Sequence, residues 1–450
     1  MESLTVSAVF KEVRRDLSAQ EAVEEANRCL YCYDAPCTKA CPTGIPVPSF
    51  IRKIATGNLK GSARAILEAN PMGATCARVC PTEELCEGAC VLNELSLPIM
   101  IGDLQRHAVN WAMQSGETLF EKRTSNGMKV AIIGSGPAGL SAARELARHG
   151  FGVTVYEAKE KAGGLDTYGI VPFRLPQEIP LWEADQVTAL GVEILTEIRV
   201  GEDISAEEIL SRYDAVLVAC GMGNVPRLGI PGEEYNGVLD AIELIENIKE
   251  GRITNEFKGK RAVVIGAGNT AIDAATCLKR AGAADVKIVY RRTEAEMTAY
   301  KSEYEFAKRE GIEFRWQWQP AEIISDVSGN VTALSLSRVV LGAPDASGKR
   351  KIQATEDPEF KLETDVVVRA IGQNRRTDLI NAFGLVHHHG ILAVDPETYQ
   401  TSNEKIYAAG DVIFGIGLTE AMVVSAVEQG KKAAYAIQRA MQTRYMREED

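Results

Sequence analysis

Long apolar runs, a surplus of positive charge and an N-terminal export signal are all missing from the 450 residues. The longest stretch without a charged side chain, Val130 to Ala143, has fourteen residues with three glycines and a proline, too short and too broken to cross a bilayer. The formal net charge of -12 excludes a typical nucleic-acid binder, which needs clustered Lys and Arg to neutralise phosphates. Met1 to Asp16 has mixed charge and no apolar core, so we expect a cytoplasmic protein with no membrane or nucleic-acid partner.

Cysteine is scarce in most of the chain and concentrated in one region. Eight of the ten cysteines lie between Cys29 and Cys90, and only Cys220 and Cys277 follow them. A disulfide framework is not expected in a reducing cytosol, so ligation of a metal or cluster is the natural alternative. The chain therefore divides into a cysteine-rich head of about 120 residues and a cysteine-poor body.

The cysteine spacing in the head favours iron–sulfur clusters. The first run is Cys29-x2-Cys32-x4-Cys37-x3-Cys41-Pro, and the second is Cys76-x3-Cys80-Pro-x4-Cys86-x3-Cys90. Bacterial ferredoxins pack three cysteines in a similar run, and a fourth before proline ligates the other cluster. By this rule the first three cysteines share one cluster and Cys41 belongs to a second. Zinc is the alternative, but structural zinc sites usually carry two short Cys pairs, and only one is present.

The head is predicted to be helical and the body α/β. Ser18 and Glu21 form a capping-box pattern that opens a helix through about Leu30, and helical periodicity returns over 50–69 and 104–113. The polar segment 121–127 is expected to be a linker. From Met128 on, short apolar strands, glycine-rich turns and amphipathic helices follow one another, as is typical of α/β folds.

The body carries the same dinucleotide-binding pattern twice. In the first copy an apolar strand, 129–133, leads into Gly134-Ser-Gly136-Pro137-Ala138-Gly139 and a helix. The first glycine permits the tight turn, the second lets the backbone approach a pyrophosphate, and the third allows close packing of helix on strand. The N-terminus of the helix offers free N–H groups to the diphosphate. The next strand ends at Glu157, 23 residues beyond Gly134, where a carboxylate accepts hydrogen bonds from a ribose 2′-hydroxyl.

The second copy favours NADP(H). It consists of Gly266-Ala267-Gly268-Asn269-Thr270-Ala271, and its second strand ends in Arg291-Arg292 rather than in an acid. Two guanidiniums at that position suit a 2′-phosphate, with NAD(H) and a solvated surface pair as the alternatives. Two dinucleotide sites in one chain indicate a flavin that a nicotinamide reduces. The body has no Cys-x-x-Cys pair to accept the electrons, so the clusters of the head are the candidate exit.

With these features together, the chain resembles the family of glutamate synthase small subunits and the N-terminal, electron-input half of dihydropyrimidine dehydrogenases. The resemblance covers about Asn27 to Ala440 and rests on the spaced cysteines, both glycine-rich motifs, Phe173-Arg-Leu-Pro176 and Tyr407-Ala-Ala-Gly-Asp411. It implies an α/β protein with a helical domain of two 4Fe–4S clusters at 1–120. It also implies a discontinuous FAD domain at 128–255 and 373–450, with an NADP(H) domain at 256–372 inserted into it.

The resemblance also implies particular ligands. One cluster would be held by Cys29, Cys32, Cys37 and Cys90, and the other by Cys41, Cys80, Cys86 and the side chain of Gln105. Counting cysteines alone would instead make Cys76 the eighth ligand. The implied FAD residues are Gly134, Gly136, Pro137, Ala138, Gly139, Leu140, Glu157, Gly163, Gly164, Leu165, Arg174, Gly410, Asp411 and Thr419. The implied NADP(H) residues are Gly266, Ala267, Gly268, Asn269, Thr270, Arg291, Arg292, Ala370, Ile371 and Gly372.

Glutamine at position 105 resembles the pyrimidine-dehydrogenase branch, because glutamate synthase small subunits tend to carry Glu there. The expected function is that of an electron-input subunit, which passes electrons from NADPH through FAD and two clusters to an FMN-containing partner that reduces uracil or thymine. The alternative within the family is the small subunit of NADPH-dependent glutamate synthase or another flavin-based ferredoxin:NADP oxidoreductase. A non-enzymatic redox sensor is a third interpretation, which diaphorase activity would exclude. No catalytic side chain is expected, since the cofactors perform the chemistry.

Overall fold

A computed structural model of the chain describes residues 10–253, 255–344, 350–415 and 421–448. The chain divides into two compact units. One unit comprises Glu12–Thr167, Arg174–Met222 and Arg375–Asp450. The other comprises Tyr168–Phe173, Gly223–Asn374 and Met1–Lys11, of which Phe10 and Lys11 are described.

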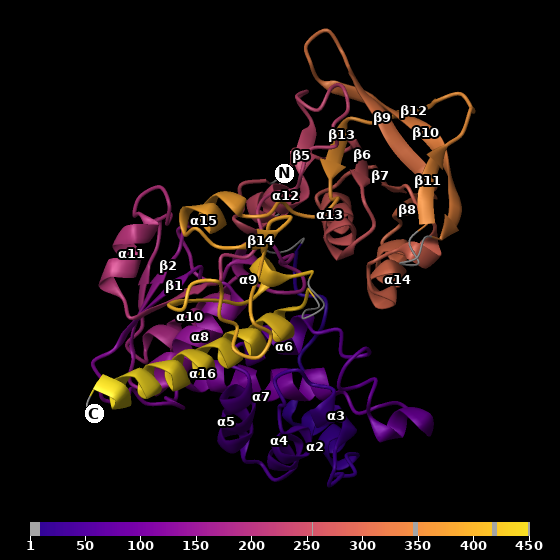
Figure 1. Cartoon of the computed structure of the whole chain (residues 1–450). Helices are drawn as coiled ribbons and strands as arrows, with labels where there is room; N and C mark the ends of the chain where they lie inside the picture. Colours follow the sequence, from indigo (N-terminus) through magenta and orange to yellow (C-terminus); the bar gives the residue numbers. More distant parts are fainter. Residues whose placement is uncertain (1–9, 254, 345–349, 416–420, 449–450) are drawn as a thin grey trace. The chain divides into compact units, whose positions relative to one another are not determined.

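The first unit begins with the cysteine-rich head, which is helical as predicted (Figure 1). Its elements are α2 (Ala19–Asn27), α3 (Pro36–Lys39), α4 (Val47–Ala55), α5 (Leu59–Ala69), α6 (Gly73–Val79), the 3-10 helix η1 (Val91–Glu94) and α7 (Ile101–Ser115). The capping box of Ser18 and Glu21 is confirmed at the start of α2. The segment 50–69, expected to be helical throughout, is broken: Gly57 has φ +74°, and Asn58 caps α5 by accepting a hydrogen bond from Gly61.

The same unit contains a five-stranded parallel sheet of order β16-β4-β1-β2-β3. Its strands are β1 (Lys129–Ile133), β2 (Gly152–Tyr156), β3 (Glu193–Leu195), β4 (Ala215–Val218) and β16 (Ile406–Ala408). The accompanying helices are α8 (Pro137–Arg148), α9 (Leu165–Tyr168), α10 (Glu178–Thr188), α11 (Ala206–Arg212), α15 (Thr377–Ala382) and α16 (Val423–Glu448), with η3 (Asp411–Ile413) and the hairpin β14 (His387–His388) and β15 (Ile391–Leu392).

Helix α16 packs closely against α8 (Figure 1). At Gly430 a Cβ atom would lie 2.1 Å from the Ala138 carbonyl oxygen, so only glycine permits this approach. The central strands β1 and β4 are buried apart from Lys129, with Val130, Ile132 and Leu217 all at 0% exposure, as expected for a parallel sheet covered on both faces.

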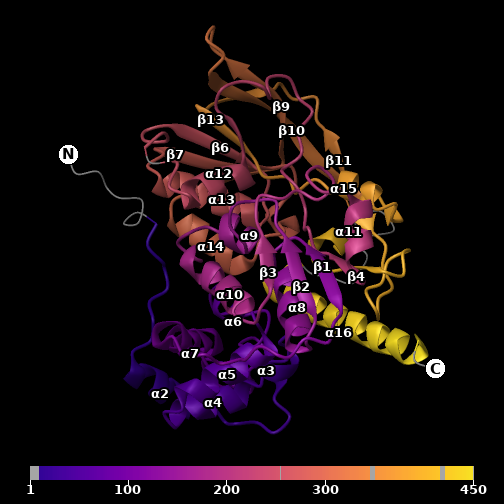
Figure 2. The same cartoon turned by 90° about the vertical axis from the view of Figure 1, so that its left-hand side faces the viewer.

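The second unit contains another five-stranded parallel sheet, of order β5-β13-β6-β7-β8 (Figure 1). Figure 2 shows β6, β7 and β13 of this sheet from another side. Its strands are β5 (Val238–Asp240), β6 (Arg261–Ile265), β7 (Asp285–Tyr290), β8 (Glu313–Trp316) and β13 (Val366–Arg369). Its helices are α12 (Ala241–Lys249), α13 (Asn269–Arg280), η2 (Glu294–Glu296) and α14 (Lys301–Arg309). An antiparallel sheet follows, formed by β9 (Trp318–Ser325), β10 (Val331–Pro344), β11 (Arg350–Ala354) and β12 (Phe360–Glu363).

The second nucleotide-binding region was expected to begin at residue 256, but in the structure it begins earlier. Strand β5 pairs in parallel with β13, so the segment from Gly223 belongs to the second unit together with β6 and α13. The α/β class is confirmed, and so is the duplication of the strand–turn–helix unit. Among the described residues no helix is both long and apolar enough to cross a membrane.

Candidate functional site

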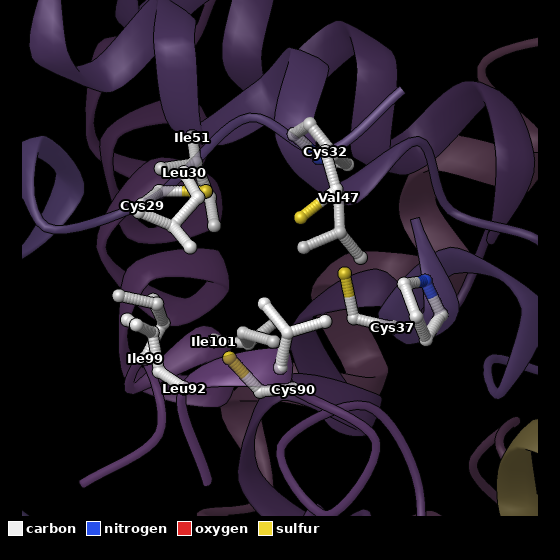
Figure 3. A pocket seen from close by; sticks show the side chains of 13 residues that line it. Cys29, Leu30, Cys32, Cys37, Val47, Ile51, Cys90, Leu92, Ile99 and Ile101 are labelled. Atoms are coloured by element: carbon white, nitrogen blue, oxygen red, sulfur yellow. The ribbon is translucent and has the colours of Figure 1, made fainter. Parts of the chain in front are cut away.

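Four cysteines of the head surround one cavity, which we call the first site. Cys29 and Cys32 lie on the loop after α2, Cys37 lies in α3, and Cys90 immediately precedes η1. All four line one cavity, and Figure 3 shows their sulfur atoms around its centre. The rest of the lining is mainly apolar, and all of it comes from residues 29–101.

Burial in this apolar cavity disfavours the thiolate form of its cysteines. It raises the pKa of Cys29 and raises that of Cys37 to about 11, and the neighbouring thiols of the site add to both shifts. Such thiols are poor free nucleophiles and need a bound cation to ionise. Iron would supply that charge.

The spacing of the side chains fits a cluster better than a single ion. Within the described ranges no group of three or more His, Cys, Asp or Glu side chains converges closely enough to hold one metal ion. A zinc site requires four ligands within about 2.3 Å of one centre, whereas a 4Fe–4S cluster accepts one thiolate at each of its irons. Four thiols spread around a cavity match the second arrangement.

The second site is built around Cys86. Burial raises its pKa well above the usual value, and the nearby thiols of Cys80 and Cys41 contribute, so these three residues lie near one another. Gln105 on α7 is 7% exposed, and its Nε2 donates to the Gly73 carbonyl at 2.7 Å. This bond occupies Nε2 and fixes the orientation of the amide. The other amide atom, Oε1, is the one that is able to bind iron.

Cys76 lies beside this site rather than away from it. Its side chain is 3% exposed and lies within hydrogen-bonding reach of Cys80, which raises its pKa together with burial. The structure therefore brings Cys76 to the second site and Gln105 beside Gly73 of α6, and the ligand set of the second site stays a prediction.

Two buried ionisable residues from the sheet-bearing part of the same unit form hydrogen bonds with residues beside the second site. Glu183 on α10 is 0% exposed and accepts hydrogen bonds from Ala74 N at 2.7 Å and from Thr75 N at 3.0 Å and Oγ1 at 2.5 Å. Burial raises its pKa to about 7. Lys431 on α16 donates to the carbonyls of Ala69 at 2.7 Å and Thr43 at 3.4 Å.

The hydroxyl of Thr43 is in turn hydrogen-bonded to the Cys41 sulfur, at 3.3 Å. Thr43 therefore connects Lys431 to the loop that carries Cys41. Sequence reasoning missed Glu183 and Lys431, because no local pattern links either residue to the head.

The first glycine-rich turn forms a cradle for a dinucleotide. At Gly134, φ is +101° and a Cβ would lie 2.5 Å from the Ala219 carbonyl oxygen, while a Cβ at Gly139 would lie 2.0 Å from the Gly134 oxygen. A Cβ added at Gly136, the N-cap of α8, would meet no atom within 4 Å. On its other side Gly164 approaches so closely that a Cβ added at Gly164 would lie 2.8 Å from the Gly136 Cα. The space in front of the helix N-terminus is thus open to a pyrophosphate, with Pro137, Ala138 and Leu140 in the first turns behind it.

Of the two acids expected at the flavin site, Glu157 is buried and Asp411 is partly buried. Glu157 is 8% exposed, and its Oε2 accepts from Ser135 N at 3.1 Å and Oγ at 2.5 Å. Burial raises the pKa of Asp411, which the Arg375 guanidinium opposes, and Gly410 N donates to Gln429 at 2.8 Å. The other expected residues, Gly163, Leu165 and Arg174, belong to the same unit, and Thr419 lies outside the described residues.

The second glycine-rich turn has the same construction. At Gly266, φ is +128° and a Cβ would lie 2.1 Å from the Ala370 carbonyl oxygen, because β13 runs beside β6 and places Ala370, Ile371 and Gly372 next to the turn. Gly268 caps α13, Ala267 is buried, and the Asn269 side chain accepts from Tyr300 N at 3.0 Å, with Thr270 in the same first turn. Of the arginine pair, Arg292 is bound to Glu296 at 3.2 Å, whereas Arg291 is exposed.

Two parallel five-stranded sheets with glycine-rich turns, together with two groups of cysteines, define an iron–sulfur flavoprotein oxidoreductase. Residues 6–117 match the family model described as dihydropyrimidine dehydrogenase domain II, 4Fe–4S cluster, and residues 128–434 match that of the pyridine nucleotide-disulphide oxidoreductases. The chain belongs to the pyridine nucleotide-disulphide oxidoreductase family and carries a 4Fe–4S domain at its head, so its cofactors are 4Fe–4S clusters, FAD and a pyridine nucleotide.

Curated relatives match nearly the whole chain. The glutamate synthase [NADPH] small chain of Escherichia coli is 34% identical over 95% of this chain and 93% of its own length. The NAD-dependent dihydropyrimidine dehydrogenase subunit PreT of Escherichia coli is 35% identical over 92% of this chain and 93% of its own length. Among solved structures, FprA of Mycobacterium tuberculosis in complex with NADPH is similar in fold, with a TM-score of 0.58 and 20% identity over 71% of this chain and 85% of FprA.

Proposed function

We propose that this chain is the electron-input subunit of a two-component enzyme whose partner carries FMN and reduces uracil or thymine to the 5,6-dihydropyrimidine. When bound, the flavin would accept a hydride from NADPH and the clusters would carry single electrons onward. The side chains of the chain hold, orient and electrostatically tune these groups, and none is assigned a role as general acid or base.

The observation that carries the proposal is the different placement of the two cysteine sites. Residues beside the second site are hydrogen-bonded to Glu183 on α10 and Lys431 on α16, which belong to the part of the unit that holds the flavin turn. The first site is lined by residues of the head only. We infer the order flavin, second site, first site, partner. The body carries no Cys-x-x-Cys pair that would offer another route.

A second candidate function, the small subunit of NADPH-dependent glutamate synthase, is favoured by a separate observation. The relative PreT is named as NAD-dependent, whereas the glutamate synthase relative is named for NADPH. The exposed Arg291 beside Arg292 suits the 2′-phosphate of NADPH. Gln105 supports the pyrimidine branch, so the two signals point to different partners.

Anaerobic affinity purification of the native complex decides between the candidates. A co-purifying FMN protein, with NADPH-dependent reduction of uracil by the complex, supports the proposal. A co-purifying amidotransferase chain, with NADPH-dependent glutamate formation from glutamine and 2-oxoglutarate, supports the second candidate. An isolated chain that fails to reduce ferricyanide with NADPH contradicts both.

The nicotinamide preference has its own test. We expect Arg291→Ala to raise KM for NADPH at least tenfold in the ferricyanide assay and to leave KM for NADH within about twofold, because only NADPH carries the 2′-phosphate. Arg292→Ala should have the smaller effect, since its guanidinium is already paired with Glu296. Equal effects on both nucleotides would contradict the phosphate contact.

A further inference from the structure

Large apolar side chains are exposed around the first site. Leu30 is 61% exposed, Tyr33 107%, Leu95 85% and Leu97 78%. Together with Val91 at 38% and Met100 at 38%, they form a surface that we call the apolar rim. These six residues come from only two short segments, 30–33 and 91–100, which directly follow Cys29 and Cys90.

Hydrogen bonds hold the second segment of the apolar rim against the end of α2, which leads into the first segment. Arg28, at the end of α2, donates to the Leu97 carbonyl at 2.7 Å and is paired with Glu25 at 2.7 Å. The same Glu25 carboxylate accepts from Met100 N at 2.9 Å. Leu97 and Met100 therefore project from a backbone that is hydrogen-bonded to the end of α2.

The apolar rim is continuous with the cavity of the first site. Leu30 and Val91 are rim residues that also line the cavity. Figure 3 shows Leu30 beside Cys29, with Leu92 close to Cys90. A protein seated on the rim would thus cover the thiols of the first site at short range.

The composition of the rim indicates what kind of surface fits it. Glu94 is the single charged residue in segments 30–33 and 91–100. Clustered exposed apolar side chains with few charges are typical of the core of a protein–protein interface, and they fit neither phosphate nor nucleic acid. The occupant should therefore present an apolar, weakly charged face.

We propose that the apolar rim is the docking surface for the protein that takes electrons from this chain, a partner that carries a one-electron acceptor. This inference rests on the proposed direction of electron flow. It is supported by the continuity of the rim with a site able to hold a redox cluster. An electron-accepting protein has to lie close to such a site, whereas a second copy of the chain does not. Oxidation of NADPH to NADP+ releases two electrons and one proton; the electrons cross the rim one at a time and reduce the partner's centre, and the proton goes to solvent.

The test replaces two rim residues that do not line the cavity, in the full chain loaded with its cofactors. The double variant Leu95→Glu/Leu97→Glu places two charges on the rim, and Val327→Glu places one at a 107% exposed position between β9 and β10 as a control. Each protein is mixed anaerobically with NADPH and one of three acceptors. The acceptors are ferricyanide, the purified FMN-containing pyrimidine-reducing subunit and the purified glutamate synthase large chain.

We expect all three forms of the chain to reduce ferricyanide at rates within about twofold, since this small oxidant needs no docking surface. With the protein acceptor that wild type reduces, the double variant should be at least tenfold slower at limiting acceptor, and Val327→Glu should match wild type. Retention of the wild-type rate by the double variant overturns the proposal. The proposal is also overturned if the wild-type chain reduces ferricyanide but neither of the two protein acceptors. It is overturned as well if the wild-type chain forms a dimer that the double variant does not form, since the rim would then bind a second copy of the chain.

A failure of the proposed function looks different in these experiments. In that case wild type itself does not pass electrons from NADPH to ferricyanide. Loss of ferricyanide reduction in the double variant alone would mean that the rim supports the site structurally, and this would also overturn a docking role.

Discussion

The two cysteine sites of the head differ in what surrounds them. The first site is lined by residues 29–101 and bordered by exposed Leu30, Leu95 and Leu97. Residues beside the second site are hydrogen-bonded to the buried Glu183 and Lys431, which come from α10 and α16. One site thus faces outward through an apolar surface, and the other lies against the flavin-binding part of its own unit.

This difference gives each site a different electrostatic control. The first site has an apolar lining, which disfavours added negative charge unless a partner protein supplies compensation. Near the second site the ammonium group of Lys431 reaches the loop of Cys41, and the carboxyl group of Glu183, with a pKa of about 7, accepts hydrogen bonds at the start of α6. Hydrogen bonds and nearby charges are the means by which a protein sets the potential of a cluster. We infer that the second site is tuned from within the chain and the first site from outside it.

Loss of a ligand should separate the two sites most clearly. We expect Cys37→Ser and Cys86→Ser each to lose about half of the bound iron, because each removes one thiolate from a different cluster. The low-temperature electron paramagnetic resonance spectra of the dithionite-reduced proteins should then lack different signals. Cys277→Ala, in the buried face of α13, serves as the control and should retain all the iron. Identical spectra of the two Ser variants would break the division into two sites.

The fourth ligand of the second site can be identified in the same way. Gln105→Leu should destabilise the second cluster and reduce its occupancy severalfold, because it removes the amide oxygen that the bond to Gly73 leaves available. Cys76→Ser should keep both clusters. The reverse pattern, with iron lost from Cys76→Ser and retained in Gln105→Leu, would make Cys76 the ligand.

Glu183 should give the second site a pH dependence. Its folded-state pKa of about 7 lies above the usual 4.5, so the folded protein holds a proton that the unfolded chain releases between these values. Stability should therefore fall as pH rises from about 4.5 to about 7, by on the order of 3 kcal/mol from this group. Denaturant midpoints followed by cluster absorbance should show a smaller loss between pH 5.5 and pH 8 in Glu183→Gln than in wild type. An equal loss of stability in both proteins would show that a group other than Glu183 causes the pH dependence.

Lys431 should have the smallest effect, confined to the second site. Removal of its charge in Lys431→Met disfavours the reduced, more negative cluster by roughly 1 kcal/mol, or about 40 mV for one electron. The effect is limited because Glu428 already pairs with Lys431 at 2.9 Å. Potentiometric titration should show the lowered potential for the second cluster only, with recovery in Lys431→Arg. An equal shift of both clusters would contradict the separation.

Features built from neighbouring residues could be predicted from the sequence. The capping box of Ser18 and Glu21 needs only three residues of separation, and the strand–turn–helix around Gly134 is determined by local sterics. The grouping of Cys29, Cys32, Cys37 and Cys90 came from the resemblance and not from spacing, since Cys90 is distant in sequence.

Contacts across long stretches of chain could not be predicted. Thr75 Oγ1 and Glu183 are 108 residues apart, and Lys431 and Ala69 are 362 apart, so no periodicity links them. The assignment of β5 to the second sheet had the same difficulty. The composition and length of the short strand Val238–Asp240 do not reveal which of the two sheets it joins. Its pairing with β13 places it in the second sheet.

The order of electron flow is tested most directly by following the flavin of the Cys37→Ser variant in a rapid-mixing experiment. NADPH should reduce the flavin at the wild-type rate, and ferricyanide should reoxidise it normally. The electron-accepting partner protein should reoxidise it at least 100-fold more slowly than in wild type, because the first site is the exit. Reoxidation by the partner at the wild-type rate would show that electrons leave the chain without passing through the first site.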